Sequence, residues 1–521
     1  MSTGIQTPQS IVSTFAPFGP AFLSTRSLQK QVSLTSVQPS AHDSVDSVPS
    51  PESASQWMVS LLDLLAGIVN RNKDFSSVMV TGTEYQQLLA VLEDLIYSVG
   101  DDENHPLSAV MTLIGVLIKT YEDQNFPKLV DLFPELAKET QVELVSEGSN
   151  SNAATFERTE ANFAIAFFSI GYLLSEAGEA EKSVSAYDLA LRLKPDYAET
   201  YNNRGVAKKD LGQYQEAIAD FDKTIRLNPN LAEPYTNRGV VMLELDQHKE
   251  AIAEHDKALS LKPDYAGAYV NRGVVKSVIG KYKEATTDYD KAIELDPDNV
   301  DAYYNRGNAK SLLGQLEAAI EDYDKAISRK KNDAEVYVNR GAAKAELDQL
   351  EAAIEDYDNA ICIAPELAKA YANRGNVNAR LRQHNQAFAD HDKAIHLSPN
   401  SAEIRYSRGI AKIIFGEYND AITDFDEAIR LNPDYADAYY NRGAVKGILK
   451  RYNAAIIDFN EVIRINPDYA EAYYNRGAAK VALEDSEEAK ADFQIALLLA
   501  KQQGKEDIKA DIEGDFKDLV I

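Results

Sequence analysis

The order of apolar and polar residues divides the chain into an irregular N-terminal part and a long, strictly periodic array. Between residues 56 and 145, apolar side chains recur at helical spacing, as at Leu61 and Leu65. Thr83 and Gln86 form a capping-box pattern in front of another apolar run. The pattern therefore predicts a small helical region over residues 56–145.

The segments on either side of this region lack any helical or strand period. Residues 1–55 are rich in Ser, Thr and Pro, and we expect them to be disordered. A targeting segment is the alternative, because nothing acidic precedes Asp43, although such segments are usually richer in Arg. Residues 146–160 begin with small polar side chains and are predicted to form a linker.

From there on, one glycine recurs every 34 residues without any insertion. Counting this glycine as position 8 of a unit divides residues 164–503 into ten units of 34 residues. A fixed period of this size predicts a solenoid of stacked repeats. The glycines that define the period are Gly171, Gly205, Gly239, Gly273, Gly307, Gly341, Gly375, Gly409, Gly443 and Gly477.

Each unit contains two helical patterns separated by a turn such as residues 211–214. Alanine at position 20 and, in most units, a ring at position 24 recur in the second helix, and a proline at position 32 usually ends it. The tenth unit has Lys501 in place of that proline, so its second helix should continue to Gly504. The apolar stripe beyond it predicts a capping helix over residues 504–521: Ile508, Ile512, Phe516 and Leu519.

This combination of Gly, Ala, aromatic and Pro positions resembles the tetratricopeptide repeat family, of a bacterial type. The resemblance covers residues 161–503 and implies an all-α fold, a right-handed superhelix with a concave inner face. It also implies a non-catalytic protein that holds an extended peptide or a partner protein in the concave groove.

Two series of charged residues depart from the family pattern. Position 7 is Arg in nine units and position 23 is acidic in the same nine, whereas the first unit has Ile170 and Ala186 there. Because the two residue types appear and vanish together, we expect an ion pair between the two helices of one unit. Lysine at position 11 shares the helix face of the arginine in seven units.

Asparagine recurs at position 6, which the family places on the concave face. A carboxamide both donates and accepts hydrogen bonds, so a row of them can bind an extended peptide backbone without reading its side chains. The alternative is that Asn is simply common at this position in the family. The residues of this predicted ladder are Asn203, Asn237, Asn271, Asn305, Asn339, Asn373, Asn441 and Asn475.

The last three units add tyrosine at position 5, namely Tyr406, Tyr440 and Tyr474. Position 2 is acidic in the same units, with Glu403, Asp437 and Glu471. Tyrosine is favoured at binding hot spots, and the acids favour a ligand that carries Lys or Arg. We therefore expect a neutral or basic extended peptide along residues 402–503, unless these tyrosines only pack between helices. No Lys occupies position 5, so a clamp for acidic tails is not expected.

Composition narrows the class of partner. The chain has 54 Lys and Arg against 82 Asp and Glu, a formal net charge of -28. Such an excess argues against nucleic acid, whose binding needs a basic surface. No apolar run reaches the roughly 20 residues of a membrane span, so we expect a soluble cytoplasmic protein without a membrane partner. The single cysteine, Cys362, excludes a disulfide framework.

Nothing in the sequence indicates catalysis. His255 and His391 occupy the aromatic slot at position 24, where packing explains them. No phosphate-binding loop, nucleophile elbow or metal-ligand spacing occurs, so we expect no enzyme activity, no cofactor and no metal.

One weaker resemblance concerns the N-terminal region. Residues Glu84 to Pro127 resemble the N-terminal hairpin of HigA-like antitoxins, a match over fewer than fifty residues without the helix-turn-helix that follows in that family. An interaction scaffold is the preferred hypothesis. The alternatives are a regulator that acts through residues 56–145 and an enzyme with a motif-less site in the same region.

Overall fold

A computed structural model describes residues 61–67, 87, 88, 91, 110, 114, 152–505 and 512 of the 521. Within these residues all regular structure is helical and no strand occurs, in agreement with the predicted all-α solenoid. In the region 56–145, the described Leu61, Leu65, Leu88 and Ile114 are helical and fully buried. The rest of this region and the predicted tail 1–55 lie outside the described residues.

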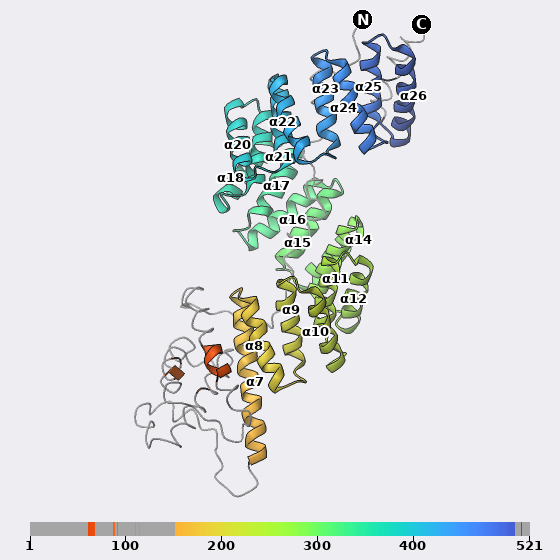
Figure 1. Ribbon diagram of the computed structural model, residues 1–521. Coiled ribbons are helices and arrows are strands. Elements are labelled where there is room, and N and C mark those ends of the chain that lie inside the picture. Colours follow the sequence, from red (N-terminus) through yellow and green to blue (C-terminus); the bar gives the residue numbers. More distant parts are fainter. Residues whose placement is uncertain are drawn as a thin grey trace. The chain divides into compact units, whose positions relative to one another are not determined.

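Residues 152–505 form a succession of helical hairpins, two helices to each predicted unit (Figure 1). The helices are α7 (Asn152–Glu176), α8 (Ala180–Leu193), α9 (Ala198–Asp210), α10 (Tyr214–Leu227), α11 (Glu233–Glu244), α12 (His248–Leu261), α13 (Ala266–Val278), α14 (Tyr282–Leu295), α15 (Val300–Leu312), α16 (Leu316–Arg329), α17 (Ala334–Glu346), α18 (Leu350–Ile363), α19 (Ala368–Arg380), α20 (His384–Leu397), α21 (Ala402–Phe415), α22 (Tyr418–Leu431), α23 (Ala436–Ile448), α24 (Tyr452–Ile465), α25 (Ala470–Val481) and α26 (Ser486–Gln503).

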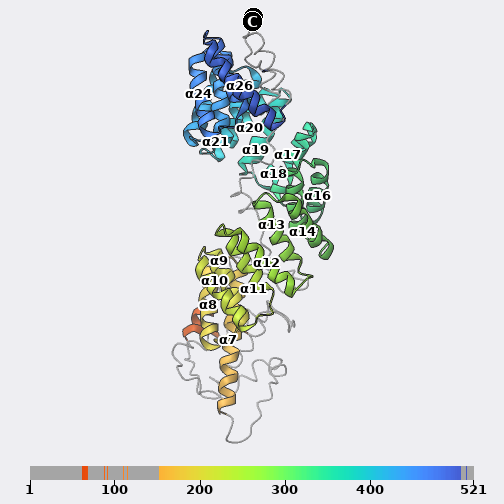
Figure 2. The same ribbon diagram turned by 90° about the vertical axis from the view of Figure 1, so that its right-hand side faces the viewer.

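The chain divides into two compact units at a turn inside the fourth repeat, between Gly280 and Lys281. One unit contains α7 to α13 and the other contains α14 to α26. Within each, consecutive hairpins stack on one another, as the view in Figure 2 also shows.

The interior of each hairpin explains why glycine is needed at position 8. A methyl group on Gly307 would lie 2.7 Å from Cε1 of Tyr323, the position-24 ring of the same repeat. Gly205 stands in the same relation to Phe221, also at 2.7 Å. The two helices therefore approach until ring and backbone touch, and only glycine leaves room for this contact.

The predicted linker is wrong in its second half. Residues from Asn152 onward are helical, because α7 begins there and runs on through the first helix of repeat one. Ala153, Ala154 and Glu157 are good helix formers, and they allow a helix that the following repeat anchors to extend toward the N-terminus.

At the other end, the last helix extends as the missing proline predicts. Helix α26 continues to Gln503 and ends at Gly504, whose φ of 69° is left-handed. Of the predicted capping helix, Ile512 is described; it is fully buried and packs in one cluster with Tyr474, Phe493 and Ala500. The rest of residues 506–521 lies outside the described part of the chain.

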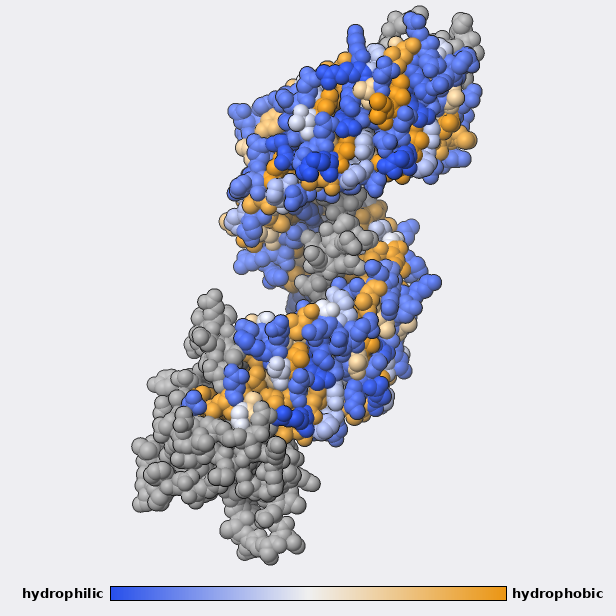
Figure 3. All heavy atoms as spheres, viewed as in Figure 1, coloured by the Kyte–Doolittle hydropathy of each residue, from blue (hydrophilic) through white to orange (hydrophobic). Residues whose placement is uncertain are grey.

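Hydrophilic residues cover most of the described surface in Figure 3, and hydrophobic residues form narrow bands between them. Among the described helices, none combines the length and the apolar character that crossing a membrane requires.

Candidate partner-binding surface

The helices of each hairpin play different parts in the stack. First helices of consecutive repeats contact one another, as α15 contacts α17 and α23 contacts α25, whereas the second helices of consecutive repeats pack together less in the described residues. Within each compact unit the first helices therefore line the side of the stack on which consecutive repeats approach most closely. Residues at positions 2, 5, 6 and 9 belong to these helices.

The arginine series at position 7 is structural, as predicted. Arg306 on α15 donates from Nε and Nη2 to both carboxylate oxygens of Asp322 on α16, at 2.9 and 2.5 Å. Lys310, one turn further along α15, approaches the same carboxylate at 2.7 Å. The intra-repeat pair recurs at Arg204, Arg238, Arg340, Arg374, Arg408, Arg442 and Arg476.

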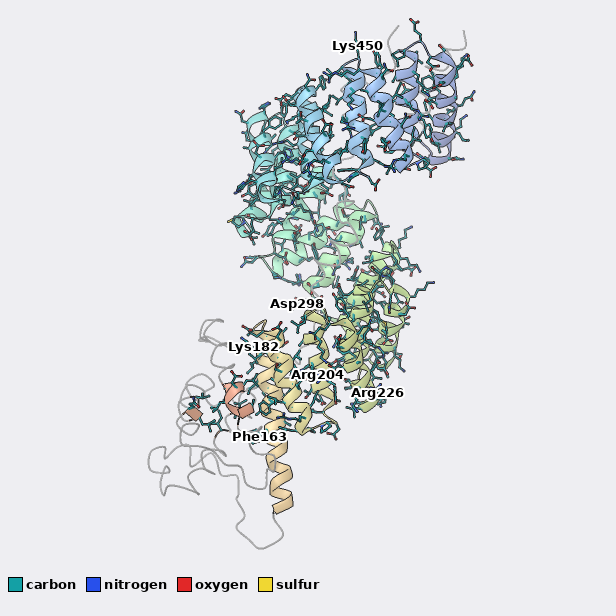
Figure 4. The ribbon with its side chains drawn as sticks, in the orientation of Figure 1. Phe163, Lys182, Arg204, Arg226, Asp298 and Lys450 are labelled. Atoms are coloured by element: carbon teal, nitrogen blue, oxygen red, sulfur yellow. The ribbon has the colours of Figure 1, made fainter. Side chains whose placement is uncertain are left out.

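Eight of the nine arginines also reach a second carboxylate that the sequence did not predict, and Arg476 reaches the amide oxygen of Asn460 instead. Nη1 of Arg306 lies 2.6 Å from Asp290, at position 25 of the preceding repeat. In the other compact unit, Arg204 of α9, which Figure 4 labels, likewise joins Asp188 of α8 to Asp220 of α10. The recurrence of aspartate at position 25 was the signal in the sequence that could have predicted this contact. The arginines therefore connect neighbouring repeats and are not free to bind a ligand.

The predicted asparagine ladder lies at the junctions between repeats. The amide nitrogen of Asn475 donates to the hydroxyl of Tyr440, at position 5 of the preceding repeat, over 2.8 Å. Asn441 donates in the same way to Tyr406 over 3.0 Å, and Asn339 to Tyr304 over 3.0 Å. In repeats two and three, Asn237 donates to Asn202 over 3.1 Å.

Burial of the remaining ladder residues varies along the chain. Asn271, Asn305, Asn339, Asn441 and Asn475 are buried, whereas Asn203, Asn237 and Asn373 are partly exposed. Oδ1 of Asn441 is buried and accepts no hydrogen bond from any described residue. Three of the amide groups, those of Asn339, Asn441 and Asn475, thus donate to a tyrosine hydroxyl. Asn441 and Asn271 each retain a buried acceptor without a donor among the described residues.

The predicted tyrosines are packed as well as hydrogen-bonded. Tyr440 and Tyr474 are buried, and Tyr406 is partly buried. The ring of Tyr406 lies 5.8 Å from that of Phe425 and 5.0 Å from that of Tyr435, measured between centroids. Tyr440 repeats this arrangement with Phe459 and Tyr469, and Tyr474 contacts Phe493. Of the rings in these stacks, Tyr406, Tyr435 and Tyr469 remain partly exposed.

The acids at position 2 differ in their internal partners. Glu335 lies 3.5 Å from Lys369, and Glu471 lies 2.7 Å from Lys505. In contrast, Glu403 and Asp437 form no ion pair with any described residue. Position 2 of repeats eight and nine, on α21 and α23, therefore holds a carboxylate that pairs with no cation among the described residues.

The pKa of the Asp437 carboxyl group reflects this surrounding. Partial burial among protein atoms raises its pKa above the usual range, and the negative charge of Glu471 raises it further. The hydroxyl of Tyr469 donates to Asp437 Oδ1 over 3.1 Å and opposes the rise. A cation that approached this place would relieve both unfavourable effects.

The residues with catalytic or metal-binding chemistry do not gather. His255 and His391 are fully buried at position 24, as the packing explanation predicts. Cys362 is exposed on α18. The described part of the chain contains no group of three His, Cys, Asp or Glu side chains placed to hold a metal ion.

Comparison with protein families agrees with the repeat geometry. Two models described as tetratricopeptide repeat and one described as TPR repeat match segments that together cover more than half of the chain. The matched segments are 164–197, 198–231, 232–265, 279–314, 300–333, 334–367, 415–447, 448–483 and 470–503.

The chain belongs to the tetratricopeptide repeat family. Six of the matched segments have the same bounds as predicted repeats. Membership of this family makes the chain a scaffold for protein–protein interaction.

Several solved tetratricopeptide repeat structures are similar to parts of the chain. YrrB, described as a repeat protein with an unusual peptide-binding site, is 30% identical over 34% of this chain and 92% of that chain, with a TM-score of 0.31. Yeast Tom70 is 16% identical over 75% of this chain and 93% of that chain, with a TM-score of 0.44. MamA is 28% identical over 32% of this chain and 97% of that chain, with a TM-score of 0.28. Comparison with the curated proteins finds no match.

Proposed function

We propose that this protein is a non-catalytic scaffold that holds an extended segment of a partner protein against the first helices of repeats eight to ten, within residues 402–503. The observation that carries the proposal is the uncompensated negative charge of Glu403 and Asp437 beside the linked tyrosines and asparagines of α21, α23 and α25. An inner helix surface of this kind combines aromatic area with hydrogen-bond acceptors.

The charge of the surface determines the class of segment. Glu403 and Asp437 would repel an acidic segment and attract one that carries Lys or Arg, so the partner segment is basic or neutral. The net charge of -28 works in the same direction over longer distances and disfavours nucleic acid. Salt should weaken the interaction because these carboxylates keep contact with solvent.

The asparagines supply the main-chain contacts in this proposal. Asn441 and Asn475 each hold a tyrosine hydroxyl of the preceding repeat, which fixes the orientation of the amide group. The unfilled acceptor Oδ1 of Asn441 can then take an N–H group of an extended segment.

The test uses the full chain and its partner captured from the native host. Asn441 and Asn475 are changed together to Ala, and binding of the partner is measured. The matched control changes Asn305 and Asn339 to Ala, which are buried position-6 residues outside residues 402–503. We expect the first pair to weaken binding at least tenfold and the control pair to change it less than twofold, with helicity unchanged in both. Equal effects of the two pairs would remove repeats eight to ten as the binding surface.

A further inference from the structure

Repeat three contains a lysine held between an acid and a ring. Nζ of Lys262, at position 31, lies 3.8 Å from Oε1 of Glu233, at position 2. The same ammonium group lies 5.1 Å from the centroid of the Tyr265 ring, at position 34. Ion pairing and a cation–π contact therefore act on one lysine side chain.

Repeat one contains the same contact between a lysine and a ring. Nζ of Lys194, also at position 31, lies 4.5 Å from the centroid of the Tyr197 ring. Tyr197 packs on Phe168, at position 5, with 5.2 Å between the ring centroids. A ring that packs on position 5 thus still offers a face to an ammonium group.

Repeats eight and nine have the acid and the stacked ring but lack the lysine. Their position-34 rings, Tyr435 and Tyr469, pack on position-5 tyrosines at 5.0 and 5.2 Å. Position 31 is Asn432 in one repeat and Asn466 in the other. Among the described residues, no cation lies over Tyr435 or Tyr469.

The backbone at these positions is the same in the filled and unfilled repeats. Lys262 has φ and ψ of -134° and 87°, compared with -134° and 94° for Asn432 and -133° and 92° for Asn466. The φ and ψ angles of the position-34 tyrosines also agree: they are -88° and 87° for Tyr265 and -80° and 86° for Tyr469. The unfilled repeats therefore present the acid and the ring on the same local framework as repeat three.

The groups around the unfilled places favour a cation. Burial raises the pKa of Tyr435, and the charges of Asp437 and Glu403 raise it further, so that ring lies in the field of both carboxylates. Asn441, whose amide nitrogen donates to the main-chain oxygen of Asp437 over 2.9 Å, has a buried Oδ1 with no donor among the described residues. That acceptor is an unfilled polar group beside Asp437.

We propose that Tyr435 with Glu403, and Tyr469 with Asp437, each hold the ammonium group of a lysine side chain from the partner segment. This inference rests on the proposed function, because it assumes a segment that runs along residues 402–503. The ligand is a lysine and not a metal ion, since the filled examples hold lysine and the described residues provide no three-ligand metal cluster.

The experiment introduces a lysine of the chain itself at each of the two places, by mutation of the full-length protein. Asn432→Lys and Asn466→Lys are combined, and Asn432→Ala with Asn466→Ala serves as the control for the loss of the asparagine side chains, which accept from Asp434 and Asp468. A second control, Asn359→Lys, adds a lysine at an exposed position of α18. The probes are a fluorescein-labelled peptide of alternating Gly and Lys and the same peptide with every lysine acetylated.

Fluorescence anisotropy should show that acetylation weakens binding roughly tenfold, in keeping with paired ionic and cation–π contacts. The paired Asn→Lys change should weaken binding of the lysine peptide to a similar degree, whereas the alanine pair and Asn359→Lys should change it less than twofold. The converse variant, Lys262→Asn, should open a separate place for the lysine peptide in repeat three.

An equal effect of Asn359→Lys and the paired lysine change would overturn the inference, because net charge alone would then explain binding. Equal binding of acetylated and unmodified peptide would also overturn it, while the proposed function would stand if Asn441 and Asn475 still govern binding of the captured partner. The proposed function itself fails only if that dependence on Asn441 and Asn475 is absent.

Discussion

Arg306 and Asp322 form a bidentate ion pair between the two helices of one repeat, with N–O distances of 2.9 and 2.5 Å. The Asp322 side chain is 4% exposed and the Arg306 side chain is 16% exposed. Because the same geometry recurs along the array, this pair is a repeated connection between α-helices, and its removal should be felt as a loss of stability.

Replacing Arg306 with Leu should lower the free energy of unfolding by about 3 kcal/mol, the lower end for breaking a buried pair. The loss stays at that end because Lys310 still lies 2.7 Å from Asp322. Denaturant unfolding of the full chain, followed by circular dichroism, measures the change. The double variant Arg306→Leu with Asp322→Ala restores the apolar pair of repeat one and should recover much of the loss. Purely additive effects of the two changes would contradict a direct pair.

The ion pair between neighbouring repeats should contribute much less to the free energy of unfolding. Asp324, which contacts Arg340 from the preceding repeat at 2.5 Å, is 53% exposed. Replacing Asp324 with Asn should therefore cost at most about 1 kcal/mol, and the cost should vanish at high salt. The same unfolding measurement at two salt concentrations checks this. A loss as large as that of Arg306→Leu would show that the exposed carboxylate, and not the buried one, holds the arginine.

Adding a methyl group at position 8 should force the two helices of a repeat apart. Gly307→Ala places Cβ 2.7 Å from the buried ring of Tyr323, so we expect a loss of about 1–3 kcal/mol. The ring cannot easily move, because its hydroxyl donates to Asn308 over 2.8 Å. A thermal melt measures the loss.

Gly67→Ala serves as a control, since nothing lies within 4 Å of the added methyl group there. An unchanged melting temperature for Gly307→Ala would show that the helices of repeat five have room to separate.

Histidine 391 should make stability depend on pH. Burial lowers its pKa from 6.5 to about 3, and the nearby Arg408 lowers it as well. The folded chain therefore does not take up the proton that the unfolded chain binds below pH 6.5, so stability is complete above that pH and falls as pH drops toward 3, by up to about 1.4 kcal/mol per pH unit.

The variant His391→Phe should remove this part of the pH dependence, because several repeats place phenylalanine at position 24. Both ring nitrogens of His391 lack hydrogen-bond partners among the described residues, so the variant should also gain about 1–3 kcal/mol at neutral pH. Unfolding curves at pH 7 and pH 5 test both points. An unchanged slope would mean that the imidazole is already protonated in the folded state.

The periodic features of this chain could be predicted from the sequence because the same pattern recurs in each repeat. The register of Gly307 against Tyr323 and the pairing of Arg306 with Asp322 both follow from spacing within one unit. The start of α7 at Asn152 did not follow, because small polar residues fit a linker as well as an exposed helix.

Contacts between repeats were harder to predict. In the sequence, the aspartate at position 25 looks like any solvent-exposed acid. Its contact with the arginine of the next repeat appears only when the repeats are stacked. The hydrogen bond from Asn475 to Tyr440 joins residues 35 positions apart. In the sequence, the position-6 asparagines and the position-5 tyrosines each look available for a ligand, but in the folded chain they bind one another. The hydrogen bond from Tyr469 to Asp437 likewise joins residues 32 positions apart and forms only in the folded repeat.

Carboxylate footprinting of the full chain, with and without its bound partner, tests the central claim most directly. Carbodiimide labelling followed by mass spectrometry compares Glu403 and Asp437, on the first helices α21 and α23, with Glu427 and Glu461, on the second helices α22 and α24 of the same repeats. We predict that the partner protects Glu403 and Asp437 and leaves the labelling of Glu427 and Glu461 unchanged. Protection of Glu427 and Glu461 alone, or of none of the four, would contradict binding along the first helices of repeats eight to ten.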